Sequence, residues 1–222
     1  MNPKIARCTT IATALTIGWL TGMASMSISK ADAPRFAELT PAQLDDQQRP
    51  IADRILKFSR IGIGGPYHIM LRSPKAAEQV INLMDYLRFQ STVPNRLKEF
   101  SIMIQGRLWR SQVEWATHYQ PALKAGVSEE TLAQLKTNMR PTSMQPDEAA
   151  VYDFCTELYT KHAVSDATYA AAVKRFGEKG VTDAIGLAGY YGITAMALAV
   201  AKATYPAGAE PKLENIAQVF PK

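Results

Sequence analysis

The sequence predicts an all-α protein, a single-domain helical bundle, and three observations lead to that prediction. Apolar residues recur every three or four positions through most of the chain after residue 40. Serine, threonine and proline stand where these runs begin, and glycine stands where several of them end, as is typical of helix termini. No alternating run of β-branched residues has the length of a strand. We expect about seven or eight helices in one sizeable domain.

Residues 1–31 have the three parts of a secretory signal peptide, and we expect them to be removed. A positively charged start, an apolar stretch and small residues ahead of Asp32 place the expected cleavage after Ala31. An uncleaved anchor helix is the alternative, but the apolar stretch is short for a membrane span. The mature domain, residues 32–222, is therefore expected to be periplasmic or secreted and not bound to a membrane.

Charge argues against a nucleic-acid partner, and the cysteine content argues against a disulfide within the mature chain. The chain has 25 lysines and arginines against 20 acidic residues, and three of the basic ones lie in the leader, which leaves 22 against 20. With no basic cluster interleaved with aromatics, no nucleic-acid partner is expected. Cys8 leaves with the leader, so Cys155 has no partner for an intrachain disulfide in the mature chain. We expect Cys155 to be a buried small hydrophobe, since a reactive thiol needs a neighbouring base or positive charge.

The first elements are expected to be helices separated by a glycine-rich break. Thr40 and Gln43 form a capping box at the start of a helix that extends to about Phe58. Residues 62–66 then break the chain; they are not a phosphate loop, because no Lys-Ser/Thr pair follows. Ser73 caps the next helix. Two more helices are expected to begin at Pro94 and Ser111, and the second of them ends at Gly126. Four others are expected at residues 129–137, 148–161, 166–176 and 183–203. Their caps, in the same order, are Ser128, Asp147, Ser165 and Thr182.

The last of these helices is unusually apolar and rich in small residues, with Gly186, Gly189 and Gly192 at three-residue spacing. These glycines would allow another backbone to approach closely. A transmembrane helix is one interpretation, but the glycines and the adjacent Tyr190 and Tyr191 favour a central core helix or a subunit interface.

The residues best suited to chemistry lie in two consecutive helices. Arg96 and Glu99 are one turn apart in the first, and Glu114 and His118 are one turn apart in the second. Residues at i and i+3 or i+4 share a helix face, so packing of these faces would bring an arginine, two carboxylates and an imidazole together. The alternatives are structural: a simple Glu114–His118 contact on one helix, or a capping box between Ser111 and Glu114.

This stretch resembles the carboxymuconolactone decarboxylase family, which shares its fold with the alkylhydroperoxidase D type of peroxidase. The matching residues are 96–99, 111–118 and 125–127. The peroxidase branch carries C-x-x-C-x-x-x-H in the second helix and a glutamate in the first. Here Ser111 and Glu114 occupy the cysteine places, His118 the histidine place and Glu99 the glutamate place. The chain therefore resembles the branch without redox cysteines, in which a Glu-Trp pair, here Glu114 and Trp115, precedes the histidine.

The resemblance implies an alkylhydroperoxidase D-like bundle that forms a homo-oligomer, a trimer or hexamer, and acts on a small molecule. It implies decarboxylation or isomerisation of an unsaturated carboxylic lactone or related acid, with His118 as acid and base, Glu99 or Glu114 as its partner, and Arg96 binding a carboxylate. Tyr67 and Trp115 would line the pocket. No histidine has the spacing of a metal ligand, so neither a metal nor an organic cofactor is expected.

Two other functions remain open. A hydroperoxide-reducing enzyme of the same fold needs a thiolate and a resolving thiol, which the motif positions lack. A noncatalytic protein could bind a small aromatic molecule in an apolar pocket lined by Tyr67, Met70 and Trp115. The expected export also counts against the family's named substrate, because that catabolism is cytoplasmic.

Overall fold

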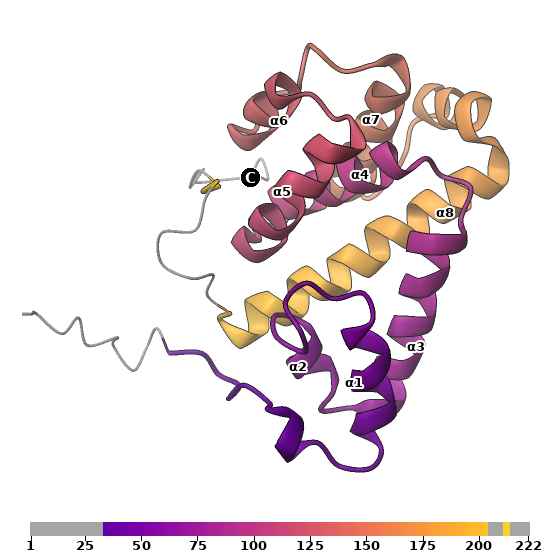
Figure 1. Ribbon diagram of the computed structural model, residues 1–222. Helices are drawn as coiled ribbons and strands as arrows, with labels where there is room; N and C mark the ends of the chain where they lie inside the picture. The colour runs from indigo at the N-terminus through magenta and orange to yellow at the C-terminus, as the bar shows by residue number, and fades with distance from the viewer. Residues whose placement is uncertain (1–32, 204–210, 214–222) are drawn as a thin grey trace, which may run out of the picture. The chain divides into compact units, whose positions relative to one another are not determined.

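The computed structural model describes residues 33–203 and 211–213, which are mostly helical and contain no strand (Figure 1). The all-α prediction is confirmed for this part of the chain. The predicted signal peptide and the cleavage site after Ala31 lie outside the described residues. The elements in chain order are η1 (Pro41–Gln43), α1 (Gln48–Leu56), α2 (Tyr67–Met70), α3 (Pro74–Asp85), the π-helical turn η2 (Tyr86–Gln90), α4 (Asn95–Leu108), α5 (Gln112–Ala125), α6 (Glu129–Lys136), α7 (Pro146–Lys161) and α8 (Asp166–Ala201).

Helix α8 lies between two groups of helices and packs against both (Figure 1). On one side α1, α2 and α3 form an apolar cluster that contains Ile55 and Ile81. On the other side α4 to α7 form a second cluster that contains Phe100 and Leu132. Residues of α8 such as Tyr190 contribute to the first cluster, and Val181 contributes to the second. The unusual apolarity of α8 follows from this position, because it has apolar neighbours on more than one face.

Several predicted helix ends are confirmed. The hydroxyl of Ser128 accepts a hydrogen bond from the Thr131 N–H at 3.1 Å, and Ser165 caps α8 in the same way. Gly126 ends α5 in the left-handed region with φ 101°. Gly177 interrupts α8 with φ 65° and ψ 174°, at the position where a helix end was predicted. The helix resumes well before Thr182, so the predicted helix start at Thr182 is wrong.

The start at Thr40 is confirmed, but the extent of the first predicted helix and the start of the helix predicted at Glu148 were wrong, because another side chain provides a cap. The first predicted helix is divided: the Gln43 side chain accepts from the Thr40 N–H at 2.9 Å but closes only the turn η1. Asp45 then accepts from the Gln48 N–H at 2.8 Å and starts α1. Helix α7 begins before Asp147, because the Glu148 carboxylate accepts from the Gln145 N–H at 2.8 Å.

Among the described residues, α8 is the one helix long and apolar enough to cross a membrane by length and composition. Its central residues Leu187, Tyr190, Tyr191 and Thr194 are nevertheless buried inside the bundle. This burial supports the interpretation of α8 as a core helix.

Candidate active site

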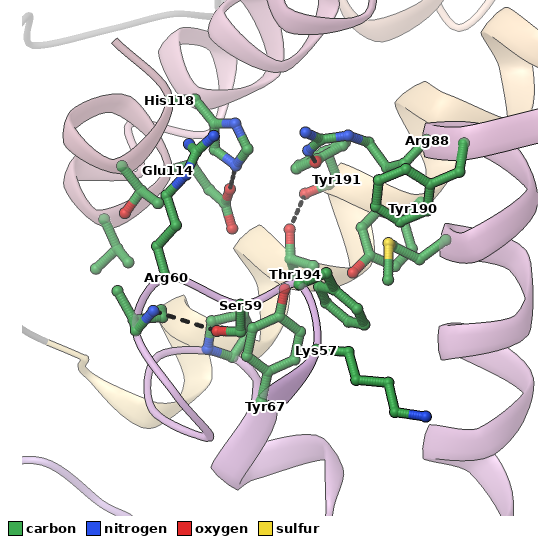
Figure 2. A pocket seen from close by; sticks show the side chains of 17 residues that line it. Lys57, Ser59, Arg60, Tyr67, Arg88, Glu114, His118, Tyr190, Tyr191 and Thr194 are labelled. Atoms are coloured by element: carbon green, nitrogen blue, oxygen red, sulfur yellow. Dashed lines mark hydrogen bonds and ion pairs between the residues drawn. The ribbon is translucent and has the colours of Figure 1, made fainter. Parts of the chain in front are cut away.

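A cavity of about 340 Å³ opens where the two helix groups meet, between the α1–α2 loop, α2, η2, α5 and α8 (Figure 2). Its volume is at the small end of the range for ligand pockets, roughly 300–1,000 Å³. Besides the apolar residues Ile61, Pro66, Met84 and Val113, four kinds of side chain line it. They are the cations Lys57, Arg60 and Arg88; the aromatic residues Phe58, Tyr67, Phe89, Tyr190 and Tyr191; His118 and Glu114; and the hydroxyls of Ser59, Thr117 and Thr194.

His118 and Glu99 meet as the helical spacing predicts. The Nδ1 atom of His118 lies 2.9 Å from Oε2 of Glu99, which is almost fully buried on α4. Close packing of the two helices makes this contact possible: a Cβ on Gly106 would lie 3.4 Å from the backbone nitrogen of Trp115. An ionised carboxylate only accepts hydrogen bonds, so Nδ1 carries a proton, and in the neutral imidazole Nε2 presents its lone pair to the pocket.

Arg88, which sequence reasoning missed, holds the other side of Glu99. Its Nη2 donates to Oε1 of Glu99 at 2.8 Å, and its Nη1 donates to the Tyr191 hydroxyl at 2.6 Å. Burial acts to raise the pKa of Glu99, but the hydrogen bond with His118 and the charges of His118 and Arg88 outweigh it and lower the pKa. The signal in the sequence was weak: one arginine in an otherwise uncharged turn.

The turn η2 that carries Arg88 is fixed by Lys98 of α4. The buried Lys98 ammonium donates to the backbone carbonyls of Arg88 at 3.0 Å and Ser91 at 3.3 Å. A π-helical turn is rare and is often found at functional sites. Here it directs the Arg88 side chain toward Glu99 and Tyr191.

The structure decides whether the Glu114 side chain closes a capping box. The Ser111 hydroxyl accepts from the Glu114 N–H at 3.3 Å, which is half of the box. The other half is missing, because the Ser111 N–H donates to the Gly106 carbonyl at 2.8 Å. The Glu114 carboxyl instead faces the pocket, with Oε2 3.7 Å from Nε2 of His118 (Figure 2). Burial raises the pKa of Glu114 and so favours its neutral form.

Tyrosines close the pocket from the side of α2 and α8. Tyr67 lines it as predicted, and burial, with the charge of Glu114, raises its pKa to about 12 despite a hydrogen bond with Tyr190. The ring of Tyr191 stands edge-on to His118 with centroids 5.4 Å apart. All three phenols therefore stay protonated at neutral pH and can donate hydrogen bonds.

Two predicted site residues lie elsewhere. Arg96 does not reach Glu99; it pairs with Asp147 at 2.7 Å and Glu148 at 2.6 Å, at the start of α7. Trp115 follows Glu114 by one position, which turns it about 100° around the helix. Its fully buried indole therefore belongs to the cluster of α4 to α7 and does not line the cavity. Met70 is not a lining residue either.

Cys155 is buried away from the cavity, and burial raises the pKa of its thiol to about 12. Among the residues that the structure describes, no three His, Cys, Asp or Glu side chains gather as a metal site. The predictions of no metal and no cofactor are not tested by this arrangement.

Comparison with known proteins establishes the fold. The chain superposes on the solved structure of the alkylhydroperoxidase AhpD core of an uncharacterized peroxidase-related protein from Ralstonia eutropha JMP134, with a TM-score of 0.63. The match covers 75% of this chain and 89% of that one. The protein therefore has the alkylhydroperoxidase D-like all-α fold. At 14% identity the likeness extends to the fold alone. No protein-family model and no curated protein matches the sequence.

Proposed function

We propose that this protein is a cofactor-free acid/base enzyme of the carboxymuconolactone decarboxylase type. It would decarboxylate or isomerise a small unsaturated carboxylic lactone or a related acid. The observation that carries the proposal is the chain Arg88–Glu99–His118, which ends with Nε2 of His118 on a small pocket, 3.7 Å from the Glu114 carboxyl. Burial raises the pKa of that carboxyl. This arrangement supplies a fixed base and a proton donor at the same place.

In decarboxylation, the bond to the substrate carboxylate breaks, CO₂ leaves, and the electron pair passes into the conjugated carbonyl as an enolate. The Tyr67 hydroxyl, which lines the cavity, would donate a hydrogen bond to that oxygen. A proton from Glu114, passed through Nε2 of His118, then returns to carbon, and Glu114 is reprotonated from water. In isomerisation, His118 would take a proton from one carbon and return it to another.

Two alternatives are less well supported. Peroxidase chemistry needs a reactive thiol, whereas Ser111 and Glu114 stand at the cysteine places and Cys155 is buried with a raised pKa. A noncatalytic binding protein remains the second alternative, because an aromatic-lined pocket can hold a ligand without turnover.

We also propose that the mature protein works in the periplasm. The exported form should then begin at Asp32, which mass spectrometry of the purified protein measures.

The test is turnover of carboxymuconolactone and related unsaturated carboxylic lactones by wild type, His118→Asn and His162→Asn. The two variants make the same chemical change, and asparagine tolerates the left-handed backbone of His162 at φ 54°. We expect His118→Asn to lose roughly 10²–10⁴-fold in kcat, with its helical circular dichroism intact, and His162→Asn to keep wild-type activity. Equal turnover by wild type and His118→Asn, or none by wild type, would remove the decarboxylase proposal.

A further inference from the structure

Positive charge exceeds negative charge around the cavity. Three cations line it, Lys57, Arg60 and Arg88, against the single carboxyl of Glu114. Even an ionised Glu114 offsets only one of these three positive charges. A small pocket with surplus positive charge attracts anions.

Arg88 is already engaged in holding the site together. Its two terminal nitrogens donate to Tyr191 and Glu99, and the other oxygen of Glu99 accepts from His118. Arg88 and Glu99 thus form an ion pair, and the charge of Arg88 is compensated within the site. The surplus charge therefore resides in the other two cations.

Arg60 and Lys57 lie on the loop between α1 and α2, which borders the cavity. Both side chains are exposed, and the structure gives neither a hydrogen bond nor an ion pair from them to another described residue. Figure 2 shows the Arg60 side chain directed toward the Glu114–His118 pair. Its charge also reaches Glu99, whose pKa it helps to lower. Arg60 is therefore close to the reacting groups without a fixed partner of its own.

We propose that Arg60 is the anion-binding subsite that positions the substrate carboxylate beside His118. Arg60 then has the role that the sequence had suggested for Arg96. The aromatic part of the lining, where Phe58 packs on Tyr67 at 6.0 Å and on Phe89 at 6.4 Å between ring centroids, fits a flat apolar body. The ligand class is a small planar organic carboxylate. That this carboxylate is the substrate rests on the proposed function. The binding test does not depend on the proposed function, because it measures affinity and not turnover.

The experiment compares benzoate with benzamide, which has nearly the same shape and no charge, by isothermal titration calorimetry at low ionic strength. We expect wild type to bind benzoate at least about tenfold more tightly than benzamide, because a charge-assisted hydrogen bond adds to the shared apolar contacts. Arg60→Gln should lose about tenfold in benzoate affinity and keep its benzamide affinity. Arg60→Lys should retain part of the preference. Lys75→Gln, which removes one exposed charge outside the cavity, should behave as wild type.

Three results would overturn the subsite: no saturable benzoate binding by wild type, unchanged benzoate affinity in Arg60→Gln, or an equal loss for benzamide. Binding and turnover separate the two proposals. Charge-selective binding without turnover would support the subsite and remove the enzyme. Lactone turnover without charge-selective binding would overturn the subsite alone.

Discussion

At the residue scale, the backbone and the side chain of Glu114 have different roles. Its backbone N–H is capped by Ser111, while its side chain is released from capping and directed toward His118. Burial raises its pKa above the ordinary value of 4.5. A carboxyl held in its neutral form can give a proton, whereas the ionised Glu99 on the other side of the imidazole can only accept one.

The raised pKa of Glu114 predicts a pH-dependent stability. Above pH 4.5 the folded protein binds more protons at Glu114 than the unfolded chain does, so its contribution to the free energy of unfolding falls as pH rises toward the raised pKa. Glu114→Gln removes this dependence. Relative to wild type, we expect the variant to gain up to about 1.4 kcal/mol per pH unit in that window. Urea unfolding at a series of pH values between 4 and 8 measures it.

Glu99→Gln is the control with the opposite sign. The pKa of Glu99 is lowered, so its stabilising contribution is present above its unfolded pKa and is lost as pH falls through the lowered value. The variant should therefore be less stable than wild type at neutral pH and approach it in acid. If the curves of wild type and Glu114→Gln run parallel, Glu114 does not have a raised pKa.

At the scale of elements, the contact between α8 and η2 sets the position of Arg88. A Cβ on Gly186 would lie only 3.1 Å from Cδ2 of Leu87, the buried residue of η2 next to Arg88. Gly189, one turn later, faces open space, and a Cβ there would have nothing within 4 Å. The two glycines thus have different physical roles although the sequence spaces them alike.

This difference predicts opposite effects of substitution. Gly186→Val should destabilise the protein by about 1–3 kcal/mol, because it overpacks a filled interface. Gly189→Ala should stabilise it by about 1 kcal/mol, because alanine has the higher helix propensity and enters free space. Chemical denaturation of both variants measures these free energies. Destabilisation of similar size at both positions would show that the local approach of Leu87 is not the cause.

At the scale of the whole molecule, the described part of α8 leaves an apolar face uncovered. Ile185, Ile193, Met196 and Val200 are between 37% and 55% exposed on this one helix. Contiguous exposed apolar residues usually mark an interaction site. We propose that copies of this chain associate through this face, which agrees with the trimer or hexamer that the family resemblance implies.

Self-association predicts a concentration-dependent mass in light scattering coupled to size exclusion. Met196→Glu places a charge in the proposed interface and should shift the protein toward the monomer, since burying an unpaired charge is costly. Ala170→Glu, at an exposed position before the Gly177 interruption, should leave the mass unchanged. A monomeric wild type at micromolar concentration would contradict the proposal.

The sequence by itself determined the features that depend on neighbours along the chain. Helical periodicity and local caps gave the all-α fold, the start of α8 at Ser165 and the end of α5 at Gly126. The four-residue spacing placed Glu114 and His118 on one face, because that spacing is fixed by the helix itself. Where two local caps competed, as at Asp45 and Gln145, the predicted boundaries were wrong.

Only the tertiary structure decided which partners these faces meet. Arg88 comes from a turn before α4, and Tyr191 joins it across 103 residues of sequence. Arg96, predicted at the site, turns instead to Asp147, 51 residues further along. The physical reason is that periodicity reports which side of a helix is buried, while ion pairs form between whatever charges packing brings within reach.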